Sequence, residues 1–168
     1  MFESVQIVGH GRVGSAIAAR LSERGVSMPE TGAELVLLCV PDRAIAEVAG
    51  AIERGPWMAH TSGATPLSAL DPHTQRFGLH PVQTFVQAGG AAQLDGSYAA
   101  VTAETDEGRA HGFALAETLG LEPFALAEAA RPLYQRAQQS RRTISSRCTP
   151  SRASSSRRRE RRPKRSCR

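Results

Sequence analysis

A single stretch, Val5 to Gly14, constrains the fold of this chain more than any other part of its 168 residues. It opens with Val-Gln-Ile-Val, which is typical of a β-strand, and runs directly into Gly-His-Gly-Arg-Val-Gly. Residues 15–21, Ser-Ala-Ile-Ala-Ala-Arg-Leu, then favour a helix. A strand, a Gly-x-Gly-x-x-Gly turn and a helix, in that order, are the context in which this pattern binds a dinucleotide.

Each glycine of this turn has its own physical role. Gly9 allows a tight turn off the strand, Gly11 lets a pyrophosphate approach the backbone, and Gly14 lets the helix pack close to the strand. The helix N-terminus would add free N–H groups and the positive end of its dipole. We therefore predict a nucleotide-binding turn, the alternative being the same turn without a ligand. The predicted cofactor contacts in it are Gly9, His10, Gly11, Arg12, Val13 and Gly14.

The rest of the first 130 residues alternates between strand and helix patterns, which indicates βαβ units and a parallel sheet. The segment 34–40 is apolar after its first acid, as expected of a central strand with both faces buried. Residues 26–28 leave room for only a very short second strand, and Pro123 places the last strand at a sheet edge. Further strands are expected at 57–60, 77–79, 97–102 and 121–126, and helices at 13–24, 43–54 and 106–119.

These patterns predict an α/β fold, with a Rossmann-like, mostly parallel sheet and helices on both of its faces. Right-handed connections bring the carboxyl ends of parallel strands to one edge of such a sheet. Four polar or glycine-rich segments follow predicted strands, at 9–14, 40–42, 60–63 and 80–81. We expect them to converge at that edge, which is where ligands bind in open α/β sheets.

Six residues of the later segments are candidate site residues. His60 and His80 are the candidate catalytic residues, because histidine exchanges protons near neutral pH; the alternative is a structural histidine bonded to loop backbone. Ser62 could hold a ribose or a substrate oxygen, or belong to a Ser-Gly turn without a ligand. The predicted cofactor contacts outside the glycine turn are Val40, Pro41, Asp42 and Ser62.

The net charge of +5 conceals two opposite halves. Residues 1–130 carry 7 Arg, no Lys and 15 acids, whereas residues 131–168 carry 14 basic residues and a single acid. The second part is rich in Arg and Ser and has no apolar face, so it cannot bury a core. We predict a dinucleotide-binding domain at 1–130 and a disordered basic tail at 131–168. Nucleic-acid binding by that tail is the rival interpretation, but it lacks aromatics interleaved for base stacking, which favours a solvated tail.

The remaining composition gives no sign of metal, disulfides or a membrane. Cys39 lies in an apolar strand pattern, and Cys148 and Cys167 lie in the basic part, without metal-ligand spacing. No apolar run approaches the roughly 20 residues of a membrane span. We expect a cytoplasmic protein with no metal site and no membrane segment.

The ordered motifs resemble those of a known family. They are 9–14 (Gly-His-Gly-Arg-Val-Gly), 37–42 (Leu-Leu-Cys-Val-Pro-Asp), 60–64 (His-Thr-Ser-Gly-Ala), 79–85 (Leu-His-Pro-Val-Gln-Thr-Phe) and 132–134 (Pro-Leu-Tyr). The chain resembles Rossmann-like oxidoreductases that carry a helical C-terminal domain of unknown function, relatives of pyrroline-5-carboxylate reductase and of deazaflavin-dependent NADP reductases. This resemblance implies NADP or NAD as cofactor, reduction of an imine or ketone, and a homodimer.

Two residues near the glycine turn bear on the choice between NADP and NAD. Glu30 lies about 20 residues past the turn, the usual offset of the acid that binds the ribose, but it follows Pro29 in a predicted turn. Arg12 could favour the added phosphate of NADP or simply face solvent. Both NADP and NAD therefore stay open.

The chain departs from the family after Tyr134. In relatives Leu-Tyr is followed by His and an Ala-rich helix that opens the helical domain, whereas here Gln135 and Arg136 lead into the Arg/Ser-rich sequence. Our hypothesis is a frameshift near Tyr134, with weak cofactor binding, low or absent turnover and no family-type dimer as its consequences. The sequence thus predicts an NAD(P)-dependent oxidoreductase, with a non-catalytic nucleotide-binding module and nucleic-acid binding as alternatives.

Overall fold

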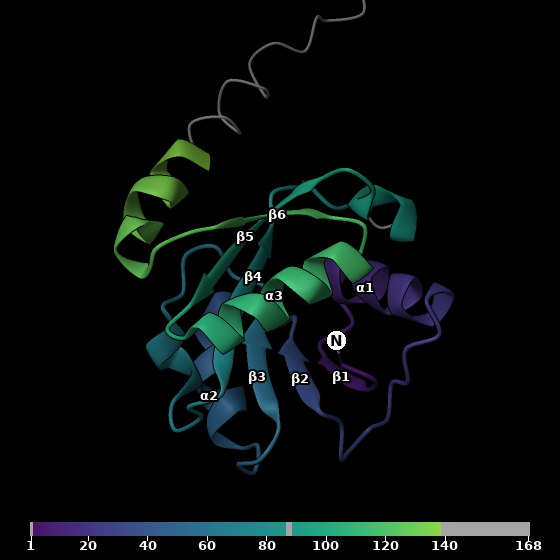
Figure 1. Cartoon of the computed structure of the whole chain (residues 1–168), viewed down its shortest axis with the longest axis horizontal. Helices are drawn as coiled ribbons and strands as arrows, with labels where there is room; N and C mark the ends of the chain where they lie inside the picture. Colours follow the sequence, from purple (N-terminus) through teal and green to yellow (C-terminus); the bar gives the residue numbers. More distant parts are fainter. Residues whose placement is uncertain (1, 87–88, 139–168) are drawn as a thin grey trace, which may run out of the picture.

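A computed structural model describes residues 2–86 and 89–138, which form one sheet covered by helices (Figure 1). The strands are β1 (Val5–Val8), β2 (Leu35–Leu38), β3 (Trp57–His60), β4 (Arg76–Pro81), β5 (Tyr98–Ala103) and β6 (Glu122–Ala125), and the α-helices are α1 (Arg12–Glu23), α2 (Ile45–Gly50) and α3 (Asp106–Thr118). Short 3-10 helices occur at η1 (Asp42–Ala44), η2 (Leu67–Leu70), η3 (Ala91–Leu94) and η4 (Glu128–Ala130). Residues 131–138 are also helical.

The sheet follows the order β1-β2-β3-β4-β5-β6, with parallel pairing everywhere except between β4 and β5. Val8 is paired with Leu38, and Leu38 with His60, so these parallel strands end together. Because β5 runs antiparallel to β4, the start of β5 lies at this same edge, where the N–H of Val82 donates to the carbonyl of Tyr98. The loops that follow β1 to β4 therefore gather along one edge of the sheet.

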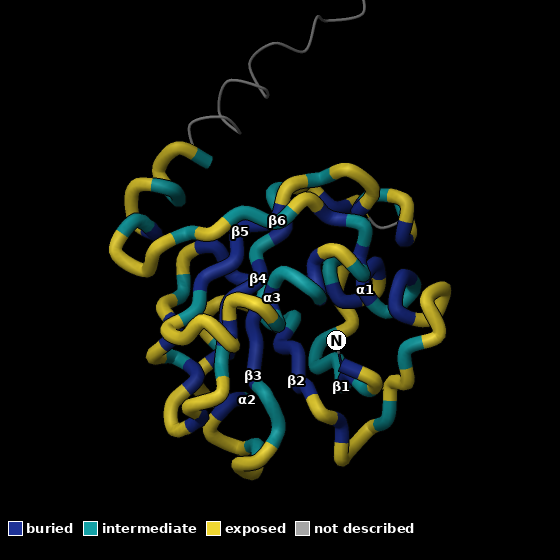
Figure 2. Tube along the Cα trace, viewed as in Figure 1, coloured by how far each residue is buried: buried dark blue, intermediate teal, exposed yellow. Residues whose placement is uncertain are grey.

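Helices cover both faces of the sheet, as predicted. One face packs against α1 and α3 through residues such as Leu37 and Phe77, and the other packs against α2 and η2 through residues such as Leu38 and Met58. Alternate residues of β2 point to opposite faces and all four are buried, because parallel strands in this architecture have no solvent face (Figure 2). This confirms the predicted fold class. β6, which contains Pro123, is the outermost strand on its side of the sheet, as predicted.

Two predicted elements are shorter than expected. The helix predicted at 43–54 is the turn η1 followed by α2, which ends at Gly50. The second strand predicted at 26–28 is reduced to one parallel bridge between Ser4 and Ser27, because the chain reverses again within a few residues to begin β2.

That single bridge fixes where the topology switches. The N–H of Val5 donates to the carbonyl of Ser27, whereas the carbonyl of Ser4 accepts from the N–H of Leu35, so Ser27 and β2 lie on opposite sides of β1. The chain thus leaves β1 in one direction and returns on its other side. In open α/β sheets the crevice at such a switch point is where ligands bind, and here it lies between the carboxyl ends of β1 and β2.

The range predicted as a disordered tail overlaps the described residues only at its start. Residues 131–138 form a helix there, with Arg131 buried. The basic residues beyond Arg136, together with Cys148 and Cys167, lie outside the described residues.

Candidate functional site

The glycine turn after β1 is packed tightly at its two ends and open in its middle. Gly9 has a φ of +103°, and a Cβ there would lie 2.6 Å from the carbonyl oxygen of Cys39. A Cβ on Gly14 would collide with the carbonyl oxygen of Gly9. Around Gly11, by contrast, a Cβ would meet nothing within 4 Å. The two outer glycines therefore hold the turn against β2, and the middle one leaves space beside the backbone.

The N-terminus of α1 opens onto this space. Gly11 is its N-cap residue, so no side chain caps the helix, and its first turn holds no acid. Its first N–H groups and the positive end of the helix dipole are therefore available to an anion. Arg12, the first helical residue, and His10 are exposed beside it, Val13 is half-buried, and Ser15 Oγ fixes the turn by donating to the carbonyl of His10.

The end of β2 forms the second wall of the crevice. Val40 is half-buried there, and a Cβ on Gly9 would lie 3.1 Å from its Cγ1. Pro41 and Asp42 follow it and are exposed. Cys39 is also half-buried, and desolvation raises the pKa of its thiol to about 12. Val40, Pro41 and Asp42 thus flank the glycine turn, and the neighbouring thiol of Cys39 is not a reactive thiolate.

Glu30 lies beyond the short bridge, on the far side of β1. Its carbonyl accepts a hydrogen bond from the Gln6 side chain, which ties the turn at Glu30 to β1, and the residue is exposed. The backbone of Glu30 is therefore tied to β1 on the side opposite β2, which is the side where the ribose acid of a Rossmann domain is expected.

His60, at the end of β3, is fully buried. Its exposed fraction is 0%, and neither ring nitrogen has a hydrogen-bond partner among the described residues. Desolvation, reinforced by the charge of Arg131, lowers the pKa of His60 to about 3. The backbone at His60 and at Pro66 acts in the opposite direction, although neither forms a hydrogen bond with the ring. His60 is therefore neutral at physiological pH and shielded from solvent.

The loop after β3 is held by its own hydrogen bonds. Ser62 is 7% exposed, and its hydroxyl accepts from the N–H groups of Ala64 and Thr65 at 3.1 and 3.0 Å. A side-chain oxygen that accepts from the backbone two and three residues on stabilises a turn. The hydroxyl of Ser62 thus stabilises the loop in this structure. Ser62 follows the end of β3, as predicted.

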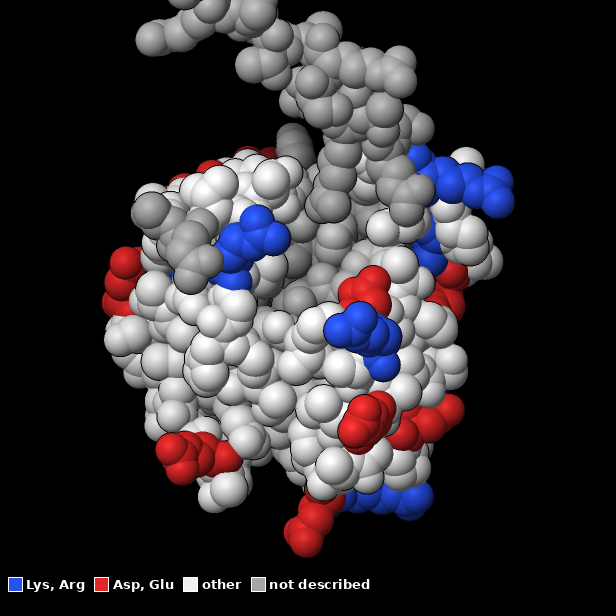
Figure 3. Space-filling view, turned by 180° about the vertical axis from the view of Figure 1, so that it is seen from behind, with Lys and Arg blue, Asp and Glu red and all other residues white. Residues whose placement is uncertain are grey.

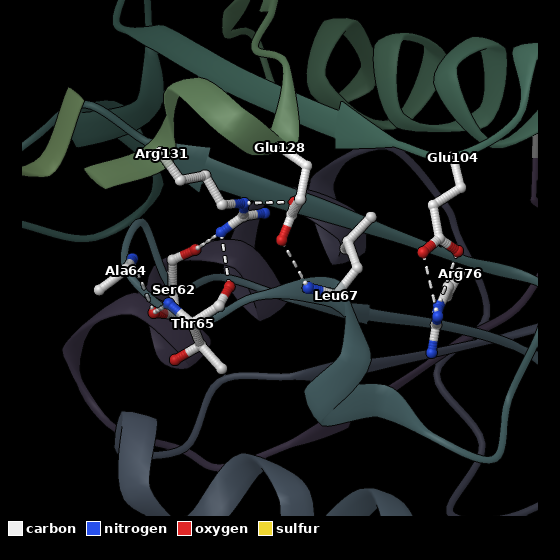
Figure 4. Close-up of polar contacts among 8 residues, drawn as sticks. All are labelled: Ser62, Ala64, Thr65, Leu67, Arg76, Glu104, Glu128 and Arg131. Carbon is white, nitrogen blue, oxygen red and sulfur yellow. Dashed lines mark hydrogen bonds and ion pairs between the residues drawn. The ribbon is translucent and has the colours of Figure 1, made fainter. Parts of the chain in front are cut away.

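An arginine and a glutamate clamp this loop from the start of the last helix (Figure 4). Arg131 Nη1 donates to the carbonyls of Ser62 and Thr65 at 3.2 and 2.6 Å, and its Nε donates to Glu128 Oε2 at 2.9 Å. The other oxygen of Glu128 accepts from the N–H of Leu67 at 3.0 Å. The Arg131 side chain is 5% exposed, and burial lowers the pKa of its guanidinium. The pair therefore fixes the 62–67 loop to the helix at 131–138.

His80 and Tyr134 form a pair at the end of β4. His80 Nδ1 lies 2.9 Å from the Tyr134 hydroxyl, and the two rings meet edge to face. A Cβ on Gly63 would lie 2.9 Å from His80 Cε1, so the ring packs directly on the loop after β3. Burial raises the pKa of Tyr134, with opposing contributions from the Gln138 side chain and from Arg131. The phenol is thus protonated at neutral pH.

An open groove of about 280 Å³ lies beside this pair. We call it the Tyr134 groove. Its wall comes from the ends of β4 to β6 and from the helix at 131–138, and it is formed by Val82, Tyr98, Phe124, Tyr134, Ala137 and Gln138.

The remaining surface gives no further candidate within residues 2–86 and 89–138. No group of three or more His, Cys, Asp and Glu side chains could hold a metal ion there. No helix in that part of the chain is long and apolar enough to cross a membrane. Figure 3 shows acidic and basic side chains scattered over one face of the molecule rather than gathered into a basic patch.

Sequence reasoning missed the clamp and the role of Tyr134. The sequence places Arg131 at the start of a predicted basic tail and predicts no role for Glu128. The spacing of these two residues, three apart, is the only local signal, and it is shared by many exposed pairs such as Asp106 and Arg109. The Pro-Leu-Tyr motif that ends at Tyr134 was noted without a role.

Solved structures share this fold, although no protein-family model and no curated protein matches the sequence. A candidate NADP oxidoreductase from Bacteroides fragilis aligns with a TM-score of 0.72 at 19% identity, over 86% of this chain and 68% of that chain. A protein from Thermotoga maritima gives 0.69 at 19%, over 85% and 65%. Prephenate dehydrogenase from Aquifex aeolicus gives 0.64 at 14%, over 89% and 73%.

These likenesses confirm the fold that the motifs suggested, a Rossmann-like fold shared with oxidoreductases and dehydrogenases. At such low identity they carry the fold alone. The chain spans about two thirds of the length of the first two structures, at 68% and 65%.

Proposed function

We propose that this chain binds a nicotinamide dinucleotide, NADP or NAD, and reduces an imine or ketone with it. The observation that carries the proposal is the glycine turn at the switch point of the sheet. Gly9 and Gly14 are positions where a Cβ would collide with backbone, whereas Gly11 faces open space at the uncapped start of α1. A pyrophosphate fits such a cradle, because it needs N–H donors, positive potential and a close approach to the backbone.

The other predicted contacts are arranged consistently with this ligand. Val40, Pro41 and Asp42 flank the turn from the end of β2, and Glu30 lies on the far side of β1. Bound there, a reduced nicotinamide supplies a hydride, and the protein supplies placement and electrostatics. The substrate would lie along the same edge, towards the ends of β3 and β4. His60 is buried and neutral, so it supports this region structurally. His80 is better placed than His60 to act on a substrate.

A fluorescence titration with NADPH and NADH tests the proposal through one matched pair of variants. Gly11 and Gly50 both have room for a Cβ and neither has a positive φ, so Gly11→Ala and Gly50→Ala should both fold. Gly11→Ala places a methyl group where the pyrophosphate approaches, and we expect its affinity to fall by about tenfold or more, roughly one lost hydrogen bond to a charged group. Gly50→Ala, at the end of α2, should bind as the wild type does.

The same titration separates the alternatives. If wild type and Gly11→Ala bind equally, or neither dinucleotide saturates the wild type, the proposed site is wrong. Saturable binding without NADPH consumption against a panel of ketones and imines would favour the non-catalytic nucleotide-binding module and remove the enzymatic part of the proposal.

A further inference from the structure

We propose that Tyr134 is a catalytic residue that donates a proton to the carbonyl oxygen of an uncharged ketone or aldehyde bound in the Tyr134 groove. His80 is the positioning residue that holds its hydroxyl. This inference rests on the proposed function, since it names the substrate class and the proton donor of that same reaction.

The groove lies where such a substrate has to be. Val82 follows β4, and Tyr98 begins β5, at the edge where the parallel strands end. The glycine turn follows β1 at that edge, three strand spacings or about 14 Å from β4. The helix at 131–138 lies beside the sheet (Figure 1), held through Arg131. The groove volume of about 280 Å³ lies just below the roughly 300 Å³ at which ligand pockets begin, so the groove suits only a small molecule.

The Tyr134 hydroxyl is held at one end of an otherwise largely apolar wall. His80 Nδ1 lies 2.9 Å from this hydroxyl, and the Gln138 side chain also acts on it. In the tautomer that carries its proton on Nδ1, the His80 ring donates to the phenol oxygen, and the hydroxyl proton is left for a substrate. Edge-to-face packing of the two rings, at 5.7 Å between centroids, restrains the direction of the phenol.

The charges around the groove select an uncharged substrate. None of the six lining residues is a Lys, Arg, His, Asp or Glu, and Arg131 contributes a positive charge that acts on Tyr134. A protonated imine would find no anionic partner among these six residues, and the carboxylate of Glu128 is already paired with Arg131, which makes its binding unfavourable. A ketone or aldehyde needs the reverse, a neutral donor for the negative charge that develops on its oxygen. A phenol whose pKa is raised by burial stays protonated and can serve as that donor.

The step balances with the reduced nicotinamide as the only co-reactant. Two electrons arrive with the hydride at the carbonyl carbon, and the π-electron pair moves onto the oxygen. The O–H bond of Tyr134 breaks, and its proton goes to that oxygen to give an alcohol. The phenolate then recovers a proton from water, while the Nδ1–H of His80 holds the phenol oxygen in place. The ketone is reduced and the dinucleotide is oxidised.

Binding can be tested without any redox chemistry. The full chain is titrated by NMR with acetophenone, a neutral aromatic ketone, and in parallel with pyrroline, a basic cyclic imine. We expect acetophenone to shift the resonances of Val82 and Phe124 saturably, and pyrroline to leave them unchanged. The inference is overturned if acetophenone leaves these resonances unchanged or if pyrroline shifts them equally.

Steady-state kinetics with NADPH and acetophenone then assign the roles. Tyr134→Phe should lower kcat by about 100-fold or more, the usual contribution of a general acid, while NADPH affinity stays unchanged. Tyr98→Ala removes part of the apolar wall and should raise KM by about tenfold with kcat retained. His80→Gln should lower kcat with little change in KM, which a purely structural role would not produce.

The outcomes distinguish this inference from the proposed function. NADPH binding with acetophenone bound outside the groove, or with Tyr134→Phe as active as wild type, would overturn the inference and leave the cofactor site standing. Acetophenone bound in the groove without NADPH consumption would overturn the assigned proton donor. Failure of NADPH to bind would defeat the proposed function, and this inference with it.

Discussion

Protonation of His60 should make the folded state depend on pH in a way that one substitution removes. The ring is buried without a hydrogen-bond partner in the described structure, and its pKa is about 3, against about 6.5 when exposed in the unfolded chain. A pKa lowered by folding gives stability that is complete above about pH 6.5 and is lost as the pH falls from there towards 3. Two charged or titratable side chains, Arg131 and His80, face the ring and both oppose its protonation.

The magnitude follows from the difference between the two states. At about pH 5 the unfolded chain binds a proton at His60 that the folded chain does not, which costs about 1.4 kcal/mol for each pH unit below 6.5. The expected loss between about pH 7.5 and pH 5 is therefore roughly 2 kcal/mol from this one group. Because small domains are stable by only about 5–15 kcal/mol, such a loss is readily measured.

Urea denaturation at these two pH values, on wild type, His60→Leu and His60→Gln, isolates the effect. Other groups titrate in the same range, so the quantity of interest is the pH dependence of each variant relative to wild type. Both variants should be less sensitive to acid by about 2 kcal/mol, because neither side chain titrates. Two replacements of different polarity prevent a packing change from imitating the result. Equal pH dependence in all three proteins would refute a buried, neutral His60.

Three further results are expected. Arg131→Met should destabilise the fold by about 1–3 kcal/mol in thermal unfolding, because it leaves the carbonyls of Ser62 and Thr65 without their donor. Arg109→Ala, at an exposed pair, should cost under about 1 kcal/mol, and similar losses in both variants would contradict the clamp. Cys39 should resist alkylation by iodoacetamide at about pH 8 in the folded protein, since its thiol pKa is about 12, and should react after denaturation. Peptide mass spectrometry follows the labelling, and rapid labelling of the folded protein would show that the thiol is accessible. Gly14→Ala should lower the unfolding temperature, because its Cβ collides with the carbonyl of Gly9; an unchanged value would mean that the turn is looser than described.

Local sequence was enough to predict the sheet and the glycine turn between β1 and α1. The run from Val5 to Gly14 specifies strand, turn and helix within ten neighbouring residues, and the apolar run at 35–38 specifies a central strand by itself. The short bridge at Ser27 was also recognisable, because too few residues separate α1 from β2 for a full strand and helix. These features depend on residues close together in the chain.

Features that depend on distant residues could not be predicted in the same way. Arg131 looks like the first residue of a basic segment, and only the tertiary fold brings it against the carbonyl of Ser62, 69 residues earlier. His60 looks like an acid–base residue at a strand end, and its burial depends on that packing. The pairing of His80 with Tyr134 spans 54 residues. In each case the sequence shows the chemistry of the residue, but it does not show which residues pack around it.

The central claim, a dinucleotide held at the glycine turn, is tested most directly by following backbone amides in an NMR titration with NADPH. The account predicts that the amides of Gly11, Arg12 and Val13, at the open start of α1, shift most and saturate together, while the amide of Gly50 stays in place. Shifts concentrated elsewhere, or no saturable shift at the turn, would contradict it.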